Sequence, residues 1–198
     1  MKCLASNIVL CIALCIIYYD SHAEESYSRA DKLALMCFEC HTADNNNPDP
    51  MIPKLIGQNA DYLVAQILHY KTGSRASTVM IDLLKDAELE DIKAIAEYFS
   101  TRPAMTGTKK ETALSIKGKD VYLGNNCHFC HGQDGDSVNA YINGAPLITG
   151  QNKEYLYKTM KDMQAEKRPV DMFNLMQQVL LKLTNDDIEA VSEYISTL

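Results

Sequence analysis

The 198-residue sequence contains no tryptophan, and it has no apolar run long enough to cross a membrane. Its longest apolar run, over residues 8–17, is about half of the roughly 20 residues that a spanning helix needs. An excess of positive charge is also missing: 19 Lys and Arg stand against 26 Asp and Glu, a formal net charge of −7. This balance argues against nucleic acid or an anionic membrane as the main partner and favours partners with basic docking surfaces.

The N-terminal segment has the features of a secretory signal. Lys2 precedes the apolar run, and Ser21-His22-Ala23 follows it with the small-x-small pattern of a cleavage site. The alternative, a retained membrane anchor, is disfavoured by the length of the run. We therefore expect residues 1–23 to be a signal peptide, removed after Ala23, and the protein to be periplasmic. Three cysteines are expected to leave with it: Cys3, Cys11 and Cys15.

The rest of the sequence is an internal repeat. Cys37-Phe38-Glu39-Cys40-His41 returns ninety residues later as Cys127-His128-Phe129-Cys130-His131, and the segment 57–63 returns at 150–156 with the same Gly-Gln-Asn-x-x-Tyr-Leu pattern. Further matched pairs are Pro53 and Pro146, Arg75 and Arg168, Met80 and Met176, Ile92 and Ile188, and Tyr98 and Tyr194. Two copies at nearly constant spacing indicate two similar domains.

We place the two domains at residues 24–103 and 104–198, with the Pro-, Gly- and Thr-containing stretch 101–110 as the linker. The first domain carries 8 basic and 13 acidic side chains, and the second carries 10 and 12. The halves therefore differ in net charge, −5 against −2, and are expected to meet different partners.

Each half is expected to be helical. Apolar residues fall on one face of a final helix, and Thr184 stands where an N-cap is expected. The face comprises Ile188, Val191, Ile195 and Leu198, and in the first half Ile92, Ile95, Ala96 and Phe99. A second helix is expected to start near Asp61 and again near Glu154, and a short helix to lead into each cysteine pair. No alternating pattern indicates strands, so the fold class predicted is all-α. Such short helices bury too little apolar surface alone, so another group must complete the core.

The Cys-x-x-Cys-His motif predicts that group. Cysteines at i and i+3 of a helical turn project to the same side, and the histidine at i+4 stands beside them. Two thiols can then add to the two vinyl groups of a porphyrin while the imidazole approaches the iron, which is the c-type haem attachment pattern. The sequence therefore predicts two covalently bound haem c groups, held by Cys37, Cys40, Cys127 and Cys130, with His41 and His131 as iron ligands.

Three other uses of the cysteine pairs are weaker. Zinc sites of two such pairs space them about 15 to 20 residues apart, far closer than here. A redox dithiol is typical of a βαβ unit, which the pattern does not show. A disulfide within either pair would close a very small loop and stabilise little.

A methionine is expected as the sixth iron ligand in each half. Met80 and Met176 each lie seven residues before equivalent positions of the final helix, Ala87 and Leu183, and we expect both in the loop ahead of that helix. A thioether favours Fe(II), and His/Met ligation is typical of cytochromes c. Met172 is the competing ligand in the second half, and Met163 a weaker one.

Two prolines and two arginines each have a predicted role at the haem and a plainer structural alternative. The carbonyls of Pro53 and Pro146 could accept the second ring N–H of the two histidines and orient them, or the prolines are plain turn formers. Arg75 and Arg168 could pair with haem propionates, or they lie in solvent at a helix end. His69 is expected on the surface, and His128 is not expected to reach an iron.

With these motifs, the sequence resembles the di-haem cytochrome c4 family of class I cytochromes c. The likeness rests on both Cys-x-x-Cys-His motifs, both Gly-Gln-Asn-x-x-Tyr-Leu segments and the two methionines, and it spans nearly the whole chain after residue 23. It implies two tandem all-α cytochrome c domains related by a pseudo-twofold axis, with haem propionates approaching at the interface. Thr42, where the family has glycine, is a departure; the second half has Gly132 there.

The resemblance implies an electron carrier rather than an enzyme. The favoured hypothesis is a shuttle that moves single electrons between a respiratory donor and a terminal acceptor such as an oxidase. The alternative is the di-haem subunit of a larger dehydrogenase, such as a sulfide-oxidising flavocytochrome c. A haem enzyme acting alone, such as a di-haem peroxidase or thiosulfate dehydrogenase, needs an open or differently ligated iron and is disfavoured by the two methionines.

Overall fold

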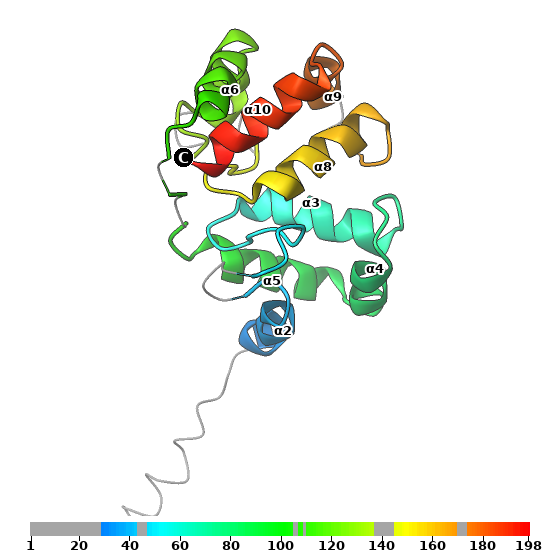
Figure 1. The fold of residues 1–198 in the computed structure, drawn as a ribbon. Helices are drawn as coiled ribbons and strands as arrows, with labels where there is room; N and C mark the ends of the chain where they lie inside the picture. The colour runs from blue at the N-terminus through cyan, green and yellow to red at the C-terminus, as the bar shows by residue number, and fades with distance from the viewer. Residues whose placement is uncertain (1–28, 43–46, 105–106, 109, 137–144, 170–173) are drawn as a thin grey trace, which may run out of the picture.

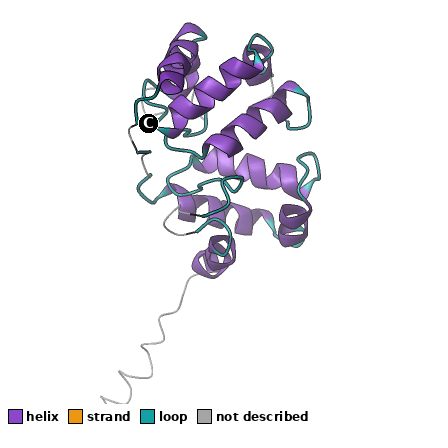
Figure 2. Ribbon diagram, viewed as in Figure 1, coloured by secondary structure: helices purple, strands orange, loops and turns teal. Residues whose placement is uncertain are grey.

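The computed structural model describes residues 29–42, 47–104, 107–108, 110–136, 145–169 and 174–198 (Figure 1). Within these ranges every regular element is a helix (Figure 2), which confirms the all-α prediction. The predicted signal peptide, residues 1–23, and the competing ligand Met172 lie outside the described residues. None of the described helices has the length and apolar character to span a bilayer.

The helices form two similar sets along the chain. The first set is α2 (Arg29–Phe38), α3 (Ala60–Lys71), α4 (Thr78–Leu84) and α5 (Leu89–Ser100). The second set is α6 (Ala113–Gly124), α7 (Cys127–His131), α8 (Lys153–Gln164), α9 (Leu175–Leu180) and α10 (Asn185–Ser196). The starts of α3 and α8 fall within one residue of the predicted ones.

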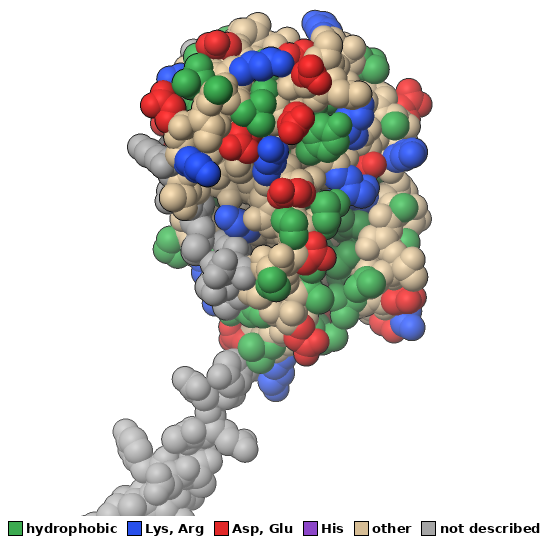
Figure 3. Space-filling view, viewed as in Figure 1, with side chains coloured by type: hydrophobic (Ala, Val, Ile, Leu, Met, Phe, Trp, Pro, Cys, Tyr) green, Lys and Arg blue, Asp and Glu red, His purple; other side chains and the backbone are tan. Residues whose placement is uncertain are grey.

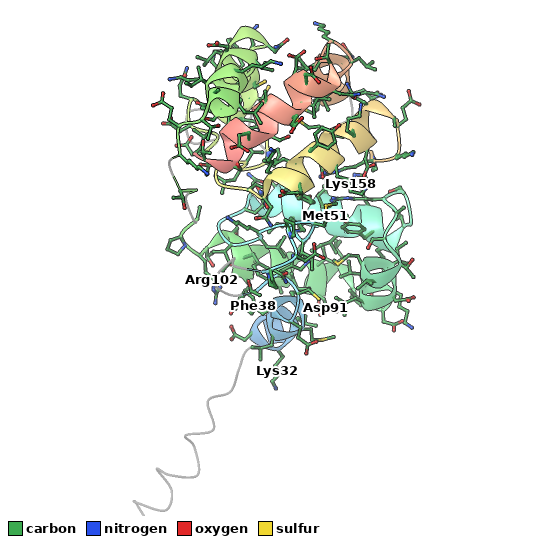
Figure 4. All side chains as sticks on the ribbon, in the orientation of Figure 1. Lys32, Phe38, Met51, Asp91, Arg102 and Lys158 are labelled. Atoms are coloured by element: carbon green, nitrogen blue, oxygen red, sulfur yellow. The ribbon has the colours of Figure 1, made fainter. Side chains whose placement is uncertain are left out.

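Each set packs around its own hydrophobic core, and the helix pairing is the same in both. In the first, α5 packs against α2 and α3; in the second, α10 packs against α6 and α8. The predicted faces of the final helices are confirmed as core, apart from Leu198, which lies beyond the end of α10 and is only partly buried. Phe38 of α2, labelled in Figure 4, meets Phe99 of α5 edge to face, and the ring centroids are 5.2 Å apart.

The final helix of the second set starts as the sequence predicts. The Thr184 side chain accepts a hydrogen bond from the backbone N–H of Asp187, and the Asp187 carboxylate accepts one from the N–H of Thr184, which is a capping box. In the first set Glu88 and Asp91 form the same arrangement at α5. These caps fix where α5 and α10 begin and thereby the register of their apolar faces.

The crossing of α6 and α10 is unusually close because Gly118 lies at the contact. A Cβ at position 118 would overlap the carbonyl oxygen of Ala190, and it would also lie 2.7 Å from the Cβ of Tyr194. Only glycine permits this approach. It brings Tyr122 of α6 into the core beside Tyr194, where the Tyr122 hydroxyl donates to the carbonyl of Gly132, just after the second Cys-x-x-Cys-His motif.

Candidate functional site

Both Cys-x-x-Cys-His motifs are helical turns. In the first, at the end of α2, the backbone N–H of His41 donates to the carbonyl oxygen of Cys37 at 2.8 Å, and that of Cys40 donates to the same oxygen at 3.3 Å. The second motif is the short helix α7 itself. A turn of this kind places both sulfurs and the imidazole on one side of the backbone, as the sequence predicts.

The cysteines of the two motifs form no disulfide within either pair. Burial is the main cause that raises the pKa of the Cys37 and Cys127 thiols to about 11, so both are neutral at physiological pH. The zinc alternative required the two pairs to meet. Among the described residues, which include the four cysteines of the two motifs, no group of three or more His, Cys, Asp or Glu side chains is placed to hold a metal ion.

The two histidines of the motifs are oriented in the same way. Nδ1 of His41 lies 2.8 Å from the carbonyl oxygen of Pro53, and Nδ1 of His131 lies 3.0 Å from that of Pro146. A carbonyl only accepts, so Nδ1 carries the proton and Nε2 keeps its lone pair free for a metal. Burial lowers the pKa of both imidazoles and favours this neutral form. The predicted contacts with the proline carbonyls are confirmed.

The two candidate methionines lie on short helices rather than in loops, so that expectation was wrong. Met80 is on α4, where Ser77 caps the helix by accepting the Met80 backbone N–H, and Met176 is on α9. Sequence spacing placed both residues correctly ahead of the final helix but did not show that the connection itself forms a turn of helix. Both side chains are partly buried and pack against the core of their own repeat.

The remaining candidates lie elsewhere. Met163, on α8, packs against the second core. His69 is partly exposed and its Nδ1 lies 3.0 Å from the hydroxyl of Ser74. His128 stacks edge to face with Phe129 inside the second motif.

Two arginines are buried between the repeats, which corrects the alternative that placed them in solvent. Arg75 is 8% exposed and donates to the hydroxyl of Tyr155 and to Gln66; Arg168 is 4% exposed and donates to the hydroxyl of Tyr62 and to the same Gln66. All four contacts are to neutral acceptors. A buried cation normally has an anionic partner, because its desolvation is otherwise uncompensated.

The guanidinium groups leave a positively charged region that fits an anionic group. Nε and Nη1 of Arg168 are buried with no hydrogen-bond partner among the described residues. Burial raises the pKa of the Tyr155 hydroxyl, but the charges of Arg168 and Arg75 outweigh this and lower it to about 8. Unpaired donors and a field of this sign match the carboxylates of a haem.

The apolar side of a haem also has a matching surface. On the face shown in Figure 3, apolar side chains gather over the lower half of the molecule, where α2 and α4 lie. Large apolar side chains remain exposed on these two helices, which also carry Cys37 and Met80: Leu35, Met36, Val79 and Leu83. A small domain rarely leaves such a patch uncovered. The residues present therefore fit a haem, both in polar donors and in apolar surface.

Two buried glutamines that the sequence did not single out connect the repeats. Gln58 and Gln151 are buried, and each hydrogen-bonds the backbone of the opposite repeat. The signal was present, because the Gly-Gln-Asn pattern recurs in both halves. It did not show that the glutamine side chain points across the domain boundary rather than into its own domain.

Two motifs with oriented histidines, on two similar helical folds, define a c-type cytochrome with two haem sites. A family model described as cytochrome c matches residues 115–198. A cytochrome c4 of Pseudomonas aeruginosa is 32% identical in an alignment 186 residues long that covers 90% of this chain and 91% of that protein. A crystal structure of reduced recombinant cytochrome c4 from Pseudomonas stutzeri is 33% identical with a TM-score of 0.76, covering 86% of this chain and 96% of that one. The chain belongs to the cytochrome c4 family.

Membership confirms the predicted fold, two tandem cytochrome c domains, and the predicted cofactor, covalently bound haem c in each domain. It also makes the chain a di-haem electron-transfer cytochrome. The "thiosulfate dehydrogenase electron acceptor" of Thiomonas intermedia is 27% identical and covers 88% of this chain and 83% of that protein. Related cytochromes thus serve as electron-transfer partners in redox systems.

Proposed function

We propose that the chain is a periplasmic carrier that moves single electrons between a respiratory donor and a terminal acceptor such as an oxidase, with both haems ligated by histidine and methionine. In this proposal residues 1–23 are a cleaved signal peptide, and residues 24–103 and 104–198 each hold one haem. The observation that carries it is the repeated contact between a motif histidine and a proline carbonyl.

Attachment is assigned to the cysteines of the two motifs. Cys37 and Cys40 would hold the first haem, and Cys127 and Cys130 the second. Placing the two cysteines of a pair on one turn lets both sulfurs reach the same edge of a macrocycle.

The iron ligands are assigned to His41 and Met80 in the first domain and to His131 and Met176 in the second. Each histidine offers Nε2, because Nδ1 is engaged by a proline carbonyl. Each methionine offers a soft thioether from a helix that packs on the core of the same domain. If a histidine and a methionine both held the iron, the protein would leave no position for a substrate, which favours transfer over catalysis.

The protein itself would orient the iron ligands and set the reduction potential of each haem. When bound, haem supplies one-electron chemistry through the Fe(II)/Fe(III) couple. The proline carbonyls hold the imidazoles in one tautomer and one orientation. The methionine sulfur favours Fe(II) and thereby raises the potential. Arg75 and Arg168 would neutralise propionates at the boundary between the domains, so that carboxylates of both haems can be held in a buried place.

The test is the spectrum of the exported, matured protein. We expect a six-coordinate low-spin spectrum in both oxidation states, two haem c per chain, and no binding of carbon monoxide to the reduced protein. Binding of carbon monoxide to either native haem would contradict the ligand assignment and would revive an enzymatic role.

A second candidate is the electron-transfer subunit of a larger dehydrogenase. It is favoured by the likeness to a thiosulfate dehydrogenase electron acceptor. Sedimentation of the natively purified protein separates the two. A stable complex with a flavoprotein or another catalytic subunit would support the second candidate, and a free chain would support the shuttle.

A further inference from the structure

Two glutamines form reciprocal bridges between the repeats. Gln58 donates from Nε2 to the carbonyl oxygen of Leu147 at 2.7 Å, and its Oε1 accepts from the backbone N–H of Leu147 at 2.8 Å. Gln151 makes the same two contacts with Lys54, both at 3.0 Å. Leu147 and Lys54 are equivalent positions of the repeat. The bridging is therefore symmetric, and each side chain amide holds both backbone groups of one residue.

These two backbone positions are the ones next to the proline carbonyls of the site. The N–H of Leu147 belongs to the same peptide group as the carbonyl of Pro146, which accepts from His131. A peptide group is planar, so fixing the direction of its N–H also fixes that of its C=O. The N–H of Lys54 and the carbonyl of Pro53 stand in the same relation to His41.

The glutamine side chains are themselves held rigidly. Oε1 of Gln58 also accepts from the N–H of Asn59, and Oε1 of Gln151 accepts from the N–H of Asn152, each at 2.9 Å. Both side chains are less than a tenth exposed. Water therefore has little access to the bridge, and the amide orientation is fixed by complementary donors and acceptors.

We propose that Gln58 is a positioning residue for His131 and that Gln151 is one for His41, so that each iron-ligating histidine is oriented from the opposite domain. The inference rests on the proposed function, which assigns the two histidines as haem ligands. Hydrogen bonds in a chain polarise one another. When a peptide N–H donates to glutamine, the carbonyl of the same peptide group therefore becomes a better acceptor. The imidazole that donates to this carbonyl becomes a stronger electron donor to iron.

Losing the glutamine bridge weakens the proline carbonyl as an acceptor. The histidine then becomes a poorer electron donor to iron, and this disfavours Fe(III). The potential of the haem in the opposite domain should rise. Mutating the hydrogen-bond partner of a metal ligand typically changes metal affinity or activity by about 10- to 100-fold. Since the glutamine lies one contact further out, we expect a smaller change, about two- to tenfold in the equilibrium constant for reduction. This corresponds to a shift of roughly 20 to 60 mV in the potential for one electron.

The experiment compares Gln58→Leu with Gln151→Leu in the full, haem-loaded protein. Both remove one bridge of the same boundary, so each is the matched control for the other. Nitrogen-15 NMR of the reduced protein follows the shift and solvent exchange of the two ligand Nδ1–H groups, and redox titration follows both potentials. Gln58→Leu should speed exchange at His131 and raise the second potential, whereas Gln151→Leu should do so at His41 and in the first domain.

Equal changes at both histidines, changes confined to the variant's own domain, or no change would each overturn the proposal, because a merely structural role predicts one of these. If the leucine variants do not fold, Gln58→Asn and Gln151→Asn keep the amide but shorten its reach, and the same crossed pattern is expected. Failure of the proposed function is seen separately in the unaltered protein. There, His41 or His131 would lack the shift of an iron-bound imidazole, whatever the glutamine variants do.

Discussion

Arg168 of the second repeat donates from Nη2 to the hydroxyl oxygen of Tyr62 in the first, at 2.5 Å. Arg75 of the first repeat makes the equivalent contact with the hydroxyl of Tyr155 in the second, at 3.1 Å. The boundary between the domains is thus built from one set of residues used twice in opposite directions. It holds two buried positive charges, and among the described residues both guanidinium groups donate to neutral groups: the two tyrosine hydroxyls and the amide oxygen of Gln66.

Removing one of these charges should lower a haem potential, because a positive charge favours the reduced state. A unit charge about 10 Å away, at an effective dielectric constant of about 20, contributes about 1.7 kcal/mol. For Arg168→Gln we therefore expect a fall of at least about 50 mV in one of the two midpoint potentials, as measured by redox titration. Lys117→Gln is the control, since Lys117 is a surface cation and its charge is screened by solvent. Equal shifts in the two variants would contradict the proposed role of Arg168.

Gly118→Ala should destabilise the second domain. The added Cβ would overlap the backbone of α10 at Ala190, so the helices must separate. Overpacking of this kind typically costs about 1–3 kcal/mol. Gly124→Ala on the same helix is the control: a Cβ there meets nothing within 4 Å, and alanine improves helix propensity by up to about 1 kcal/mol. Guanidinium unfolding followed by circular dichroism measures both, and equal stability of the two variants would show that the contact is unimportant.

The methionine ligands can be identified one at a time. Loss of a thioether from iron removes the methionine-to-iron charge-transfer band of the oxidised protein. Met80→Ala and Met176→Ala should each abolish about half of that band and open one iron to carbon monoxide, whereas Met172→Ala should leave the band intact. If Met172→Ala removes half of the band and Met176→Ala does not, the second-domain ligand is Met172.

Docking to a basic redox partner should weaken with salt. The whole chain has a formal net charge of −7, and attraction between exposed charges is screened over about 8–10 Å at 0.1–0.15 M salt. Stopped-flow measurement of electron transfer to a small basic redox protein should show a bimolecular rate that falls steeply with ionic strength. An uncharged small reductant is the control, and its rate should change little. A rate with the basic protein that is indifferent to salt would count against electrostatic docking.

Much of this architecture could be predicted from sequence because the chain repeats itself. Apolar spacing alone located the core faces of α5 and α10, and the Thr184 cap was visible because capping depends on a few neighbouring residues. The Cys-x-x-Cys-His turns are equally local. The contact of each histidine with a proline carbonyl spans 12 or 15 residues, and the sequence offered it as one of two possible roles for the prolines.

Contacts between the halves were harder to foresee. Nothing in the sequence states which side of a helix faces the other domain, so the buried state of Arg75 and Arg168 and the direction of Gln58 and Gln151 needed the structure. The helical turn around Met80 was missed for a different reason. Helices of six or seven residues show too little apolar periodicity to separate them from loops.

Each repeat is assigned one haem, held through its own cysteine pair. The most direct measurement is the number of haem c groups per chain after maturation, from the pyridine haemochrome spectrum and the intact mass. We expect two in the unaltered protein, one in Cys37→Ala/Cys40→Ala, one in Cys127→Ala/Cys130→Ala, and none when all four are replaced. Two covalent haems in either paired variant, or folded matured protein with none at all, would contradict the account.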